Sequence, residues 1–340
     1  MIFVSGGTGM VGSHLLLSLC KKQQPVVALN RPGADFSLVR KVFSLYGKDD
    51  AALFERIKWV EGDLMDYFSL ETALDQVDEI YHCAALVSFQ PGDKLTMLRY
   101  NVEGTANLVN AALSKGIKKF CHISSIAAIG RTDNTAPIDE QTQWKSSGRN
   151  STYAISKYGA EREVWRGIAE GLPAVIISPS IILGPGNWNK GSAELITLVW
   201  KGLPYYTTGV NGYVDVRDVV AVMELLMEKE YFGERYIVSS ENISYQQFFT
   251  WIAELLGKKP PSINVSPFMG EIAWRLFAVQ GLFKRKKPAI TRETARTSNR
   301  AYAYSSKKLT DTTGFRFMPV KQSLTDICTF FLEEKKQPKP

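Results

Sequence analysis

The chain has 340 residues, 45% of them hydrophobic, so it can bury a large core and is long enough for one large domain or two. No apolar run reaches the roughly 18 residues of a membrane helix, and the N-terminus lacks a basic segment followed by an apolar one, so we expect a cytoplasmic protein. The four cysteines are widely spaced and there are three histidines, which disfavours disulfides, a metal site and a Ser-His triad.

The net charge of +7 is concentrated near the C-terminus, where residues 258–340 hold 17 Lys and Arg against 6 Asp and Glu. Such a balance favours an anionic ligand or surface near that end, such as a nucleotide, a coenzyme A thioester or an acidic lipid. The alternative is that these charges simply solvate surface helices. We expect a small-molecule substrate and no nucleic-acid partner.

An apolar, β-branched run leads directly into three glycines at a spacing of three, Gly6, Gly9 and Gly12, and a helical apolar pattern follows. This predicts a strand, a tight turn and a helix. In such a unit the glycines let the backbone approach a pyrophosphate, and the helix N-terminus offers N–H groups to the phosphates. Gly7, Gly9 and Gly12 satisfy a second dinucleotide frame. The alternative is a plain strand-turn-helix unit without a cofactor.

The second predicted strand, residues 25–30, ends at Asn30 and Arg31. An acidic residue here, about 20 residues past the glycines, would bind the ribose 2′-hydroxyl and repel a 2′-phosphate. Because Asn30 is neutral and Arg31 can pair with a phosphate, the sequence favours NADP, with Arg40 and Lys41 as further candidates and NAD as the alternative cofactor. Otherwise Arg31 is an ordinary surface arginine.

Strands and helices then alternate, which predicts an α/β fold with a Rossmann doubly wound parallel sheet. The predicted strands cover residues 57–60, 79–85, 118–125 and 174–178, and the predicted helices cover residues 94–115, 153–169 and 219–227.

The alternation lapses after Pro179, which predicts a second lobe. We expect residues 1–178, rejoined by 212–229, to form an NAD(P)-binding Rossmann domain. Residues 179–211 and 230–335 are expected to form a smaller α/β substrate lobe, and residues 336–340 a frayed tail.

The residues best suited to chemistry are Ser125, at the end of the fifth strand, and Tyr153 with Lys157, which share one face of a helix. The lysine charge should lower the pKa of the phenol from about 10, so that the hydroxyl can exchange a proton near neutrality. Ser125 would hold the substrate oxygen beside it. These residues lie at the C-terminal edge of the predicted sheet, where open parallel sheets bind ligands.

Together with the glycine turn, these residues resemble the extended short-chain dehydrogenase/reductase family, which includes nucleotide-sugar epimerases and dehydratases. The resemblance covers nearly the whole chain, and further segments that carry it are Gly62-Asp63-Leu64, Ala84-Ala85, Asn101-Val-Glu-Gly104, Gly184-Pro-Gly186 and Tyr213-Val-Asp-Val-Arg-Asp218. It implies an NAD(P)-dependent enzyme in which Tyr153 is the general acid/base, Lys157 bonds the nicotinamide ribose and Ser125 polarises the substrate.

The resemblance also implies a set of cofactor contacts. Asp63 would reach the adenine, Asn101 would belong to a supporting helix, and Pro179 would lie against the nicotinamide. The cofactor-binding residues predicted in this way are Gly6, Thr8, Gly9, Met10, Val11, Gly12, Arg31, Asp63, Leu64, Ala84, Ala85, Asn101, Ser124, Tyr153, Lys157, Pro179 and Ser180.

The residues after the serines separate the branches of this family. Sugar 4,6-dehydratases carry an Asp-Glu pair there, whereas this chain has Ile126-Ala-Ala128 and lacks the acid that expels a hydroxyl. This run, Arg31 and residues 82–89 look more like the branch of dihydroflavonol reductase, cinnamoyl-CoA reductase and 3β-hydroxysteroid dehydrogenase. Ser178 departs from the arginine of many relatives, which leaves the charge of the substrate open.

We therefore expect an NADP-dependent oxidoreductase that moves a hydride between the nicotinamide and a carbonyl or secondary alcohol. A nucleotide-sugar epimerase with retained cofactor is the alternative, and a non-catalytic NADP-binding regulator is a third. Regulators of this family generally lose the Tyr-Lys pair. Candidate substrate contacts are Ser88, Phe89, Ser125, Trp188 and Tyr213. For the aromatic residues, core packing is the alternative.

Two features concern partners. Residues 268–283, followed by the basic segment Lys284–Lys287, fit either an amphipathic helix on a membrane surface or a pocket lid with an exposed basic turn, of which we favour the lid. The family resemblance also implies a homodimer, paired through the helices at residues 94–115 and 153–169.

Overall fold

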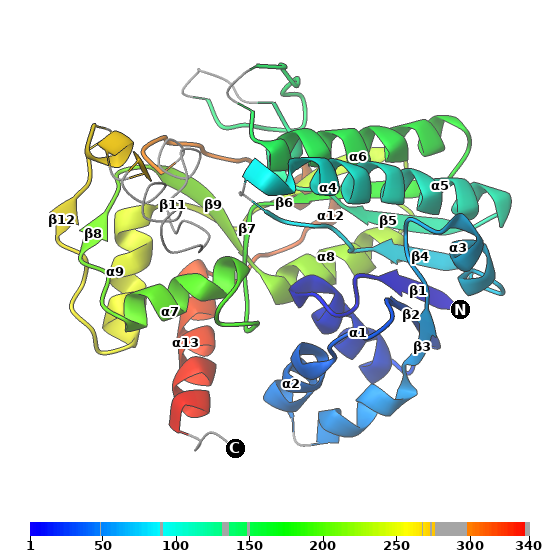
Figure 1. Cartoon of the computed structure of the whole chain (residues 1–340), viewed down its shortest axis with the longest axis horizontal. Coiled ribbons are helices and arrows are strands. Elements are labelled where there is room, and N and C mark those ends of the chain that lie inside the picture. The colour runs from blue at the N-terminus through cyan, green and yellow to red at the C-terminus, as the bar shows by residue number, and fades with distance from the viewer. Residues whose placement is uncertain are drawn as a thin grey trace.

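The computed structural model describes residues 1–47, 49–88, 91–130, 136–147, 150–266, 268–272, 274–275 and 298–336. A large parallel sheet with helices on both faces adjoins a smaller lobe built from later segments of the chain (Figure 1). This is the Rossmann arrangement that the alternation of strands and helices predicted.

The large sheet has seven parallel strands in the order β10-β6-β5-β4-β1-β2-β3. Its strands are β1 (Ile2–Ser5), β2 (Val26–Asn30), β3 (Lys58–Glu61), β4 (Glu79–His82), β5 (Lys119–Ile123), β6 (Ala174–Pro179) and β10 (Glu234–Val238). The chain order reverses between β1 and β4, so a crevice forms at the carboxyl ends of these strands, as in other doubly wound sheets.

Helices cover both faces of this sheet because the strands are apolar on both sides. On one face lie α1 (Met10–Lys21), α2 (Ser37–Tyr46), α8 (Val216–Glu228) and α12 (Lys307–Thr313), with a 3-10 segment at Asp49–Arg56. On the other lie α3 (Tyr67–Ala73), α5 (Gly104–Ser114) and α6 (Thr152–Ala169).

The helix predicted at residues 94–115 has three parts. It begins as α4 (Lys94–Leu98) after a 3-10 turn at Pro91–Asp93, passes through a π-helical turn at Arg99–Glu103 and continues as α5. Asn101, the residue with low helix propensity, lies in the π-helical turn. Such turns often occur at functional sites.

The smaller lobe has its own core. A three-stranded sheet contains β7 (Ile181–Leu183), β9 (Val210–Asp215) and β11 (Glu241–Ser244), and β8 (Tyr205–Tyr206) pairs with β12 (Ile263–Asn264). The helices α7 (Glu194–Trp200), α9 (Tyr245–Leu255) and α13 (Val320–Lys336) pack around the same apolar cluster, and a 3-10 turn at Gly191–Ala193 precedes α7. Figure 1 shows this lobe to the left of the large sheet.

Four segments differ from the expected division of the chain, which otherwise stays a prediction. Residues 212–215, expected in the Rossmann domain, belong to β9 of the three-stranded sheet, and α12, expected in the smaller lobe, packs on the large sheet. Glu234–Val238 falls in the range expected for the smaller lobe, yet it pairs with β6 as the edge strand β10 of the large sheet. Helix α13 continues to Lys336, one residue into the expected tail, and the rest of the tail lies outside the described residues.

Candidate functional site

The glycine turn after β1 has the geometry of the frame Gly6, Gly9 and Gly12. Gly6 has a φ of 72°, in the left-handed region that favours glycine. A Cβ atom on Gly12 would lie 2.2 Å from the Gly6 carbonyl oxygen, so glycine is required where α1 meets the turn. By contrast, a Cβ atom on Gly7 would meet the flexible end of Leu16 at 2.8 Å. The structure thus favours the first frame.

Gly9 is the N-cap of α1, and no described side chain caps this helix. The first-turn N–H groups therefore face the crevice without a side-chain acceptor, which is the arrangement that binds phosphates. The turn also contacts the segment that follows the neighbouring strand β4, because a Cβ atom on Gly6 would lie 2.6 Å from the backbone nitrogen of Ala84.

The end of β2 presents Arg31 to solvent. The Asn30 side chain donates to the Arg31 carbonyl oxygen at 3.3 Å, which shapes the backbone there and leaves the guanidinium of Arg31 exposed. The two other cationic candidates have different partners. Arg40 lies over the Phe54 ring, and Lys41 points to the smaller lobe, where its ammonium is 2.6 Å from a Glu334 carboxylate oxygen.

Three further segments border the crevice. Asp63 follows β3 and accepts a hydrogen bond from the Met65 backbone N–H at 2.9 Å, while Leu64 packs against Gly104. Asn101 joins the segment after β4 to α6. Its side chain accepts from the Leu86 N–H at 2.7 Å and donates to the Leu86 carbonyl and to the Ser156 hydroxyl, both at 2.9 Å. Asn101 thus supports the site by linking the Leu86 backbone to Ser156 on α6.

The Ser125 side chain lies beside Tyr153. Ser125 caps the 3-10 turn Ile126–Ala128, whose Ala127 N–H donates to its hydroxyl at 3.1 Å, and Tyr153 lies in the first turn of α6. Burial raises the pKa of Tyr153, and the Ser125 side chain offsets part of this rise. The expected direction, a pKa lowered by Lys157, is wrong for the protein without cofactor, because burial disfavours the phenolate.

Lys157 is buried, with 2% of its surface exposed, and donates to the Ile123 carbonyl oxygen at 2.7 Å. Burial lowers the pKa of Lys157 to about 8, while the charge of Glu161, and that of Cys83 once its thiol ionises, act in the opposite direction. His82 and His122 lie nearby, and burial holds the pKa of His82 at about 3 and that of His122 well below its usual range. At neutral pH these imidazoles are uncharged and Lys157 is a cation.

Two site residues were missed from the sequence, namely Glu161 and Arg235. The Glu161 carboxylate accepts from the Ser124 hydroxyl at 2.5 Å and lies 2.8 Å from the Arg235 guanidinium. The hydroxyl of Ser124, predicted to bind cofactor, therefore points to Glu161. Spacing could have pointed to Glu161, which follows Lys157 by four residues, but nothing local marks Arg235 on β10.

The comparisons with known proteins agree with this geometry. The family model described as "NAD dependent epimerase/dehydratase family" matches residues 2–239. The chain belongs to this family. It is an NAD(P)-dependent enzyme of the short-chain dehydrogenase/reductase type, as its glycine turn and sheet order indicated.

Several known proteins resemble this family member along most of its length. It is 30% identical over 266 residues to sterol demethylase protein B of Methylococcus capsulatus, covering 78% of this chain and 77% of that one. A putative dihydroflavonol 4-reductase of Synechocystis sp. is 29% identical, with 97% of this chain and 94% of that one covered. The crystal structure of gox2253 superposes with a TM-score of 0.81 at 30% identity, covering 99% of each chain.

The crevice of this enzyme fits a dinucleotide. The uncapped helix terminus and the close approach at Gly6 and Gly12 leave room for a pyrophosphate but none for side chains. At the other end, beyond Pro179, the Ser180 hydroxyl is buried and has no hydrogen-bond partner among the described residues. It is thus available to a polar group beside the end of β6.

The structure argues against two of the predicted substrate residues. Trp188 is buried in the core of the smaller lobe, where its indole N–H donates to Glu334 at 2.6 Å. Tyr213 has no exposed surface and stacks on Phe248, with ring centroids 4.3 Å apart. Both have the core role given as the alternative. Ser88 donates to Asp93 at 2.6 Å, and Phe89 lies outside the described residues.

Proposed function

We propose that the protein is an NADP-dependent oxidoreductase that transfers a hydride between the nicotinamide and a carbonyl or secondary alcohol, using Ser125, Tyr153 and Lys157. The observation that carries this proposal is that the Ser125 side chain lies beside Tyr153, with Lys157 one helical turn away at the carboxyl edge of the sheet. When bound, NADP would supply or accept the hydride.

The side chains have distinct parts in this proposal. In the reducing direction Ser125 donates a hydrogen bond to the carbonyl oxygen, and Tyr153 delivers a proton to that oxygen as it gains charge. The raised pKa of Tyr153 keeps the phenol protonated before the reaction, which suits a proton donor. Lys157 would bond the nicotinamide ribose, and its ammonium stabilises the phenolate left behind.

The residues directly after Ser125 support a reductase. Ile126 and Ala127 provide no acid for a dehydration, and the similarity to a putative dihydroflavonol 4-reductase extends over 97% of the chain. The alternative, a nucleotide-sugar epimerase, would use the same three residues with a retained cofactor, and the family description includes it. A non-catalytic NADP-binding regulator is less favoured because the Tyr-Lys pair is present.

Replacing the proposed acid tests the catalytic part. Tyr153→Phe should lower kcat by about 100-fold or more, because general acid catalysis contributes that much, with little change in NADPH affinity. Tyr158→Phe is a matched control on the same helix, where the ring stacks on Trp144 with centroids 4.4 Å apart. Full turnover by Tyr153→Phe would refute the mechanism.

A substrate screen separates the two enzymatic functions. Aldehydes, ketones and UDP- or GDP-sugars would be tested while NADPH absorbance and product stereochemistry are measured together. Net oxidation of NADPH with a carbonyl compound supports the reductase. Epimerisation of a sugar nucleotide without net cofactor consumption would replace it by the epimerase.

A further inference from the structure

We propose that Glu161 is a positioning residue for the site, holding the Lys157 ammonium in place by a carboxylate that Ser124 and Arg235 keep fixed. The effect of Glu161 on turnover rests on the proposed function. The charge interaction itself can be measured without any substrate.

Three successive turns of α6 engage three consecutive residues at the end of β5. Tyr153 lies beside the Ser125 side chain, Lys157 donates to the Ile123 carbonyl oxygen at 2.7 Å, and Glu161 accepts from the Ser124 hydroxyl at 2.5 Å. The spacing of four residues puts the three α6 side chains on one face. The Glu161 contact therefore belongs to the same register that sets the catalytic pair against the strand.

Glu161 is as deeply buried as Lys157, and its carboxylate is held on both oxygens. One oxygen accepts from Ser124, and the other accepts from Arg235 at 2.8 Å and from the Trp165 indole at 3.2 Å. Fixed in this way, the carboxylate keeps its charge at a constant distance from Lys157. In a site shielded from water such a charge interacts strongly.

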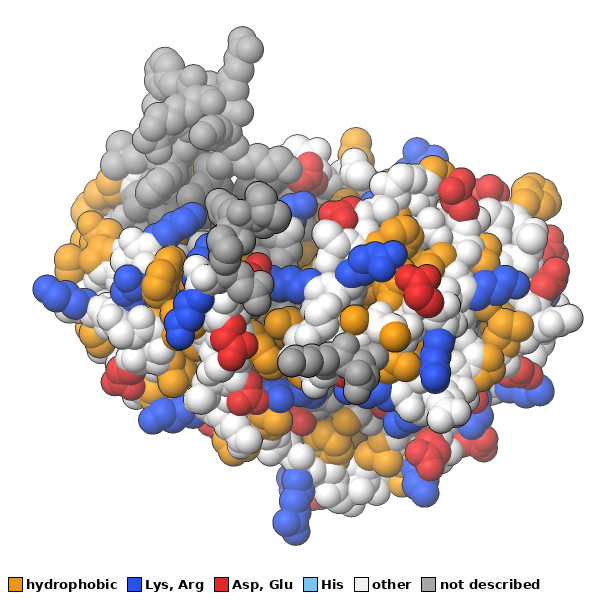
Figure 2. All heavy atoms as spheres, turned by 90° about the horizontal axis from the view of Figure 1, so that it is seen from below, with side chains coloured by type: hydrophobic (Ala, Val, Ile, Leu, Met, Phe, Trp, Pro, Cys, Tyr) orange, Lys and Arg blue, Asp and Glu red, His pale blue; other side chains and the backbone are white. Residues whose placement is uncertain are grey.

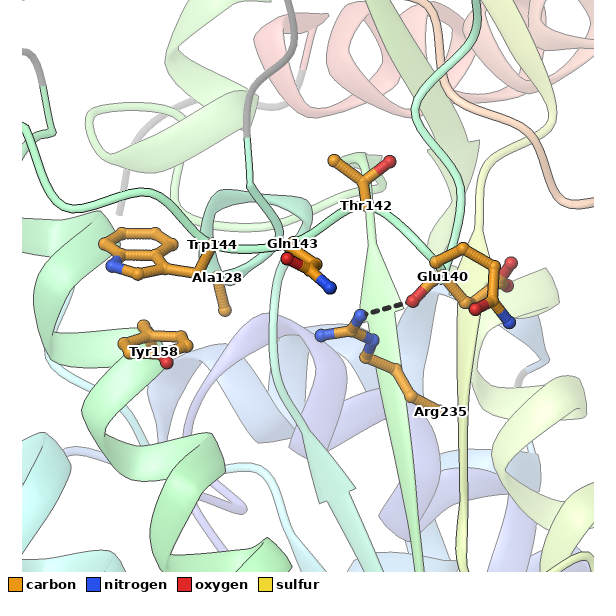
Figure 3. Close-up of a pocket in the computed structure, with 8 residues that line it drawn as sticks. Ala128, Glu140, Thr142, Gln143, Trp144, Tyr158 and Arg235 are labelled. Atoms are coloured by element: carbon orange, nitrogen blue, oxygen red, sulfur yellow. Dashed lines mark hydrogen bonds between the residues drawn. The ribbon is translucent and has the colours of Figure 1, made fainter.

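Arg235 is held in place by a hydrogen bond to Glu140, a residue outside the sheet. Its other terminal nitrogen donates to the Glu140 carbonyl oxygen at 2.7 Å, and the Glu140 carboxylate accepts from the Ile237 N–H at 2.7 Å. Figure 3 shows Arg235 reaching from its strand to Glu140 along a pocket of about 490 Å³, with the stacked rings of Trp144 and Tyr158 on the far wall. Arg235 thus holds the Glu161 carboxylate in a fixed position.

The surroundings of Lys157 contain no second carboxylate among the described charged groups that act on it. From β4 it faces His82 and, just beyond, the Cys83 thiol; from β5 it faces His122; and on α6 it has Tyr153 and Glu161. Burial keeps both imidazoles and the thiol uncharged near neutrality, with a pKa of about 12 for Cys83. Glu161 is therefore the counter-charge for the ammonium.

The test is Glu161→Gln, which retains an amide able to bond Ser124 and Arg235 but removes the charge. Protein labelled with 13C at the lysine Cε positions would be titrated by NMR, with the Lys157 signal assigned from Lys157→Met. The pKa of Lys157 should fall by about one unit. The alkaline limb of the pH profile of kcat should move down by the same amount, with KM little changed.

Two variants complete the test. Glu163→Gln removes an acid from the same helix that pairs with Arg166 at 3.0 Å, and it should leave the Lys157 titration unchanged. Glu161→Asp keeps the charge and should recover most of the shift. An unshifted Lys157 pKa in a folded Glu161→Gln protein would overturn the proposal.

Should Glu161→Gln fail to fold because Arg235 is left unpaired, the double variant Glu161→Gln/Arg235→Gln removes both charges. A lowered Lys157 pKa in that protein supports the proposal, whereas a parental value means that Glu161 serves Arg235 alone and overturns it. The NMR result requires no turnover. A shifted pKa in a protein without oxidoreductase activity would therefore reject the proposed function and keep this inference.

Discussion

At the proposed catalytic tyrosine, burial and the neighbouring Ser125 side chain shift the pKa of the phenol in opposite directions. Spacing placed Tyr153 and Lys157 on one helix face correctly, but the lysine donates to the Ile123 carbonyl, and burial raises the pKa of the phenol. The direction of such a pKa shift depends on how far the fold shields the group from water, and residue spacing along the chain does not specify this burial.

Lys157 yields a prediction about stability and pH. Its pKa is lowered from 10.5 to about 8, so between these values the unfolded chain binds more protons and stability rises with pH. Below pH 8 the buried charge has its full cost. We expect Lys157→Met to gain stability relative to the parent at pH 7 and to lose this advantage by pH 10, a change on the order of 3 kcal/mol.

Urea unfolding of the cofactor-free proteins at pH 7 and 10 measures this difference. Lys229→Met, on an exposed lysine after α8, is the control and should differ from the parent equally at both pH values. A gain for Lys157→Met that does not depend on pH would contradict the prediction.

Arg31 yields a prediction about cofactor choice. Its exposed guanidinium at the end of β2 can pair with a 2′-phosphate, so Arg31→Ala should weaken NADPH binding by about 10- to 100-fold and leave NADH binding nearly unchanged. Calorimetric titration measures both affinities. Arg40→Ala is the control, since Arg40 lies 3.9 Å over the Phe54 ring, and an equal loss for both cofactors would count against a phosphate contact.

Among the elements, the glycine turn is the most constrained. Gly12→Ala would put a methyl group 2.2 Å from the Gly6 carbonyl oxygen and force α1 away from the turn. We expect a loss of about 1–3 kcal/mol in unfolding free energy, together with weaker NADPH binding. Gly92→Ala, where no described atom lies within 4 Å of the added Cβ, should lower neither the unfolding free energy nor NADPH affinity. Equal behaviour of the two variants would refute the constraint.

The segment at residues 94–115 shows how far an element can be predicted. Its apolar spacing indicated a helix, and a helical segment is present, but the π-helical turn at Arg99–Glu103 was not foreseen. The turn lets Asn101 reach both the Leu86 backbone and Ser156. These partners belong to other elements, so the spacing of apolar residues within the helix cannot predict the π-helical turn.

For the whole molecule, Lys41 makes one of the contacts between the two parts of the fold. Its ammonium, on α2, lies 2.6 Å from Glu334 on α13 and donates to the Gly186 carbonyl oxygen at 3.1 Å. Gly186 is in turn so close to Met10 that an added Cβ would lie 2.8 Å from the methionine Cε. These contacts thus hold the smaller lobe beside the glycine turn.

Removing the Lys41 contacts with Glu334 and Gly186 should affect both the stability of the protein and its affinity for NADPH. Lys41→Met should lower the unfolding free energy by about 1 kcal/mol, because the pair is partly exposed, and should weaken NADPH binding through the loop at Gly186. Lys21→Met breaks an equally short pair, to Asp50, within the large domain and should leave NADPH binding intact. Similar effects of both variants on NADPH affinity would contradict this role.

The surface has charges of both signs. On the face in Figure 2, Lys and Arg are interspersed with Asp and Glu and form no continuous basic area, despite the excess of basic residues after 258. Within the described part of the chain, no helix is long and apolar enough to span a bilayer. The side chains of Phe268, Met269 and Ile272 are exposed, while Lys284–Lys287, for which a lid or a membrane contact was considered, lies outside the described residues.

The sequence by itself determined the strand-turn-helix unit at Gly6, the family, and the shared face of Tyr153 and Lys157. These features depend on spacing within one element and on backbone freedom, which adjacent residues specify. The tertiary structure alone decided that Trp188 and Tyr213 are buried, that β10 joins the large sheet, and that Ser124 bonds Glu161. Burial and partner choice depend on residues far apart in the chain, such as Glu161 and Arg235, which only folding brings together.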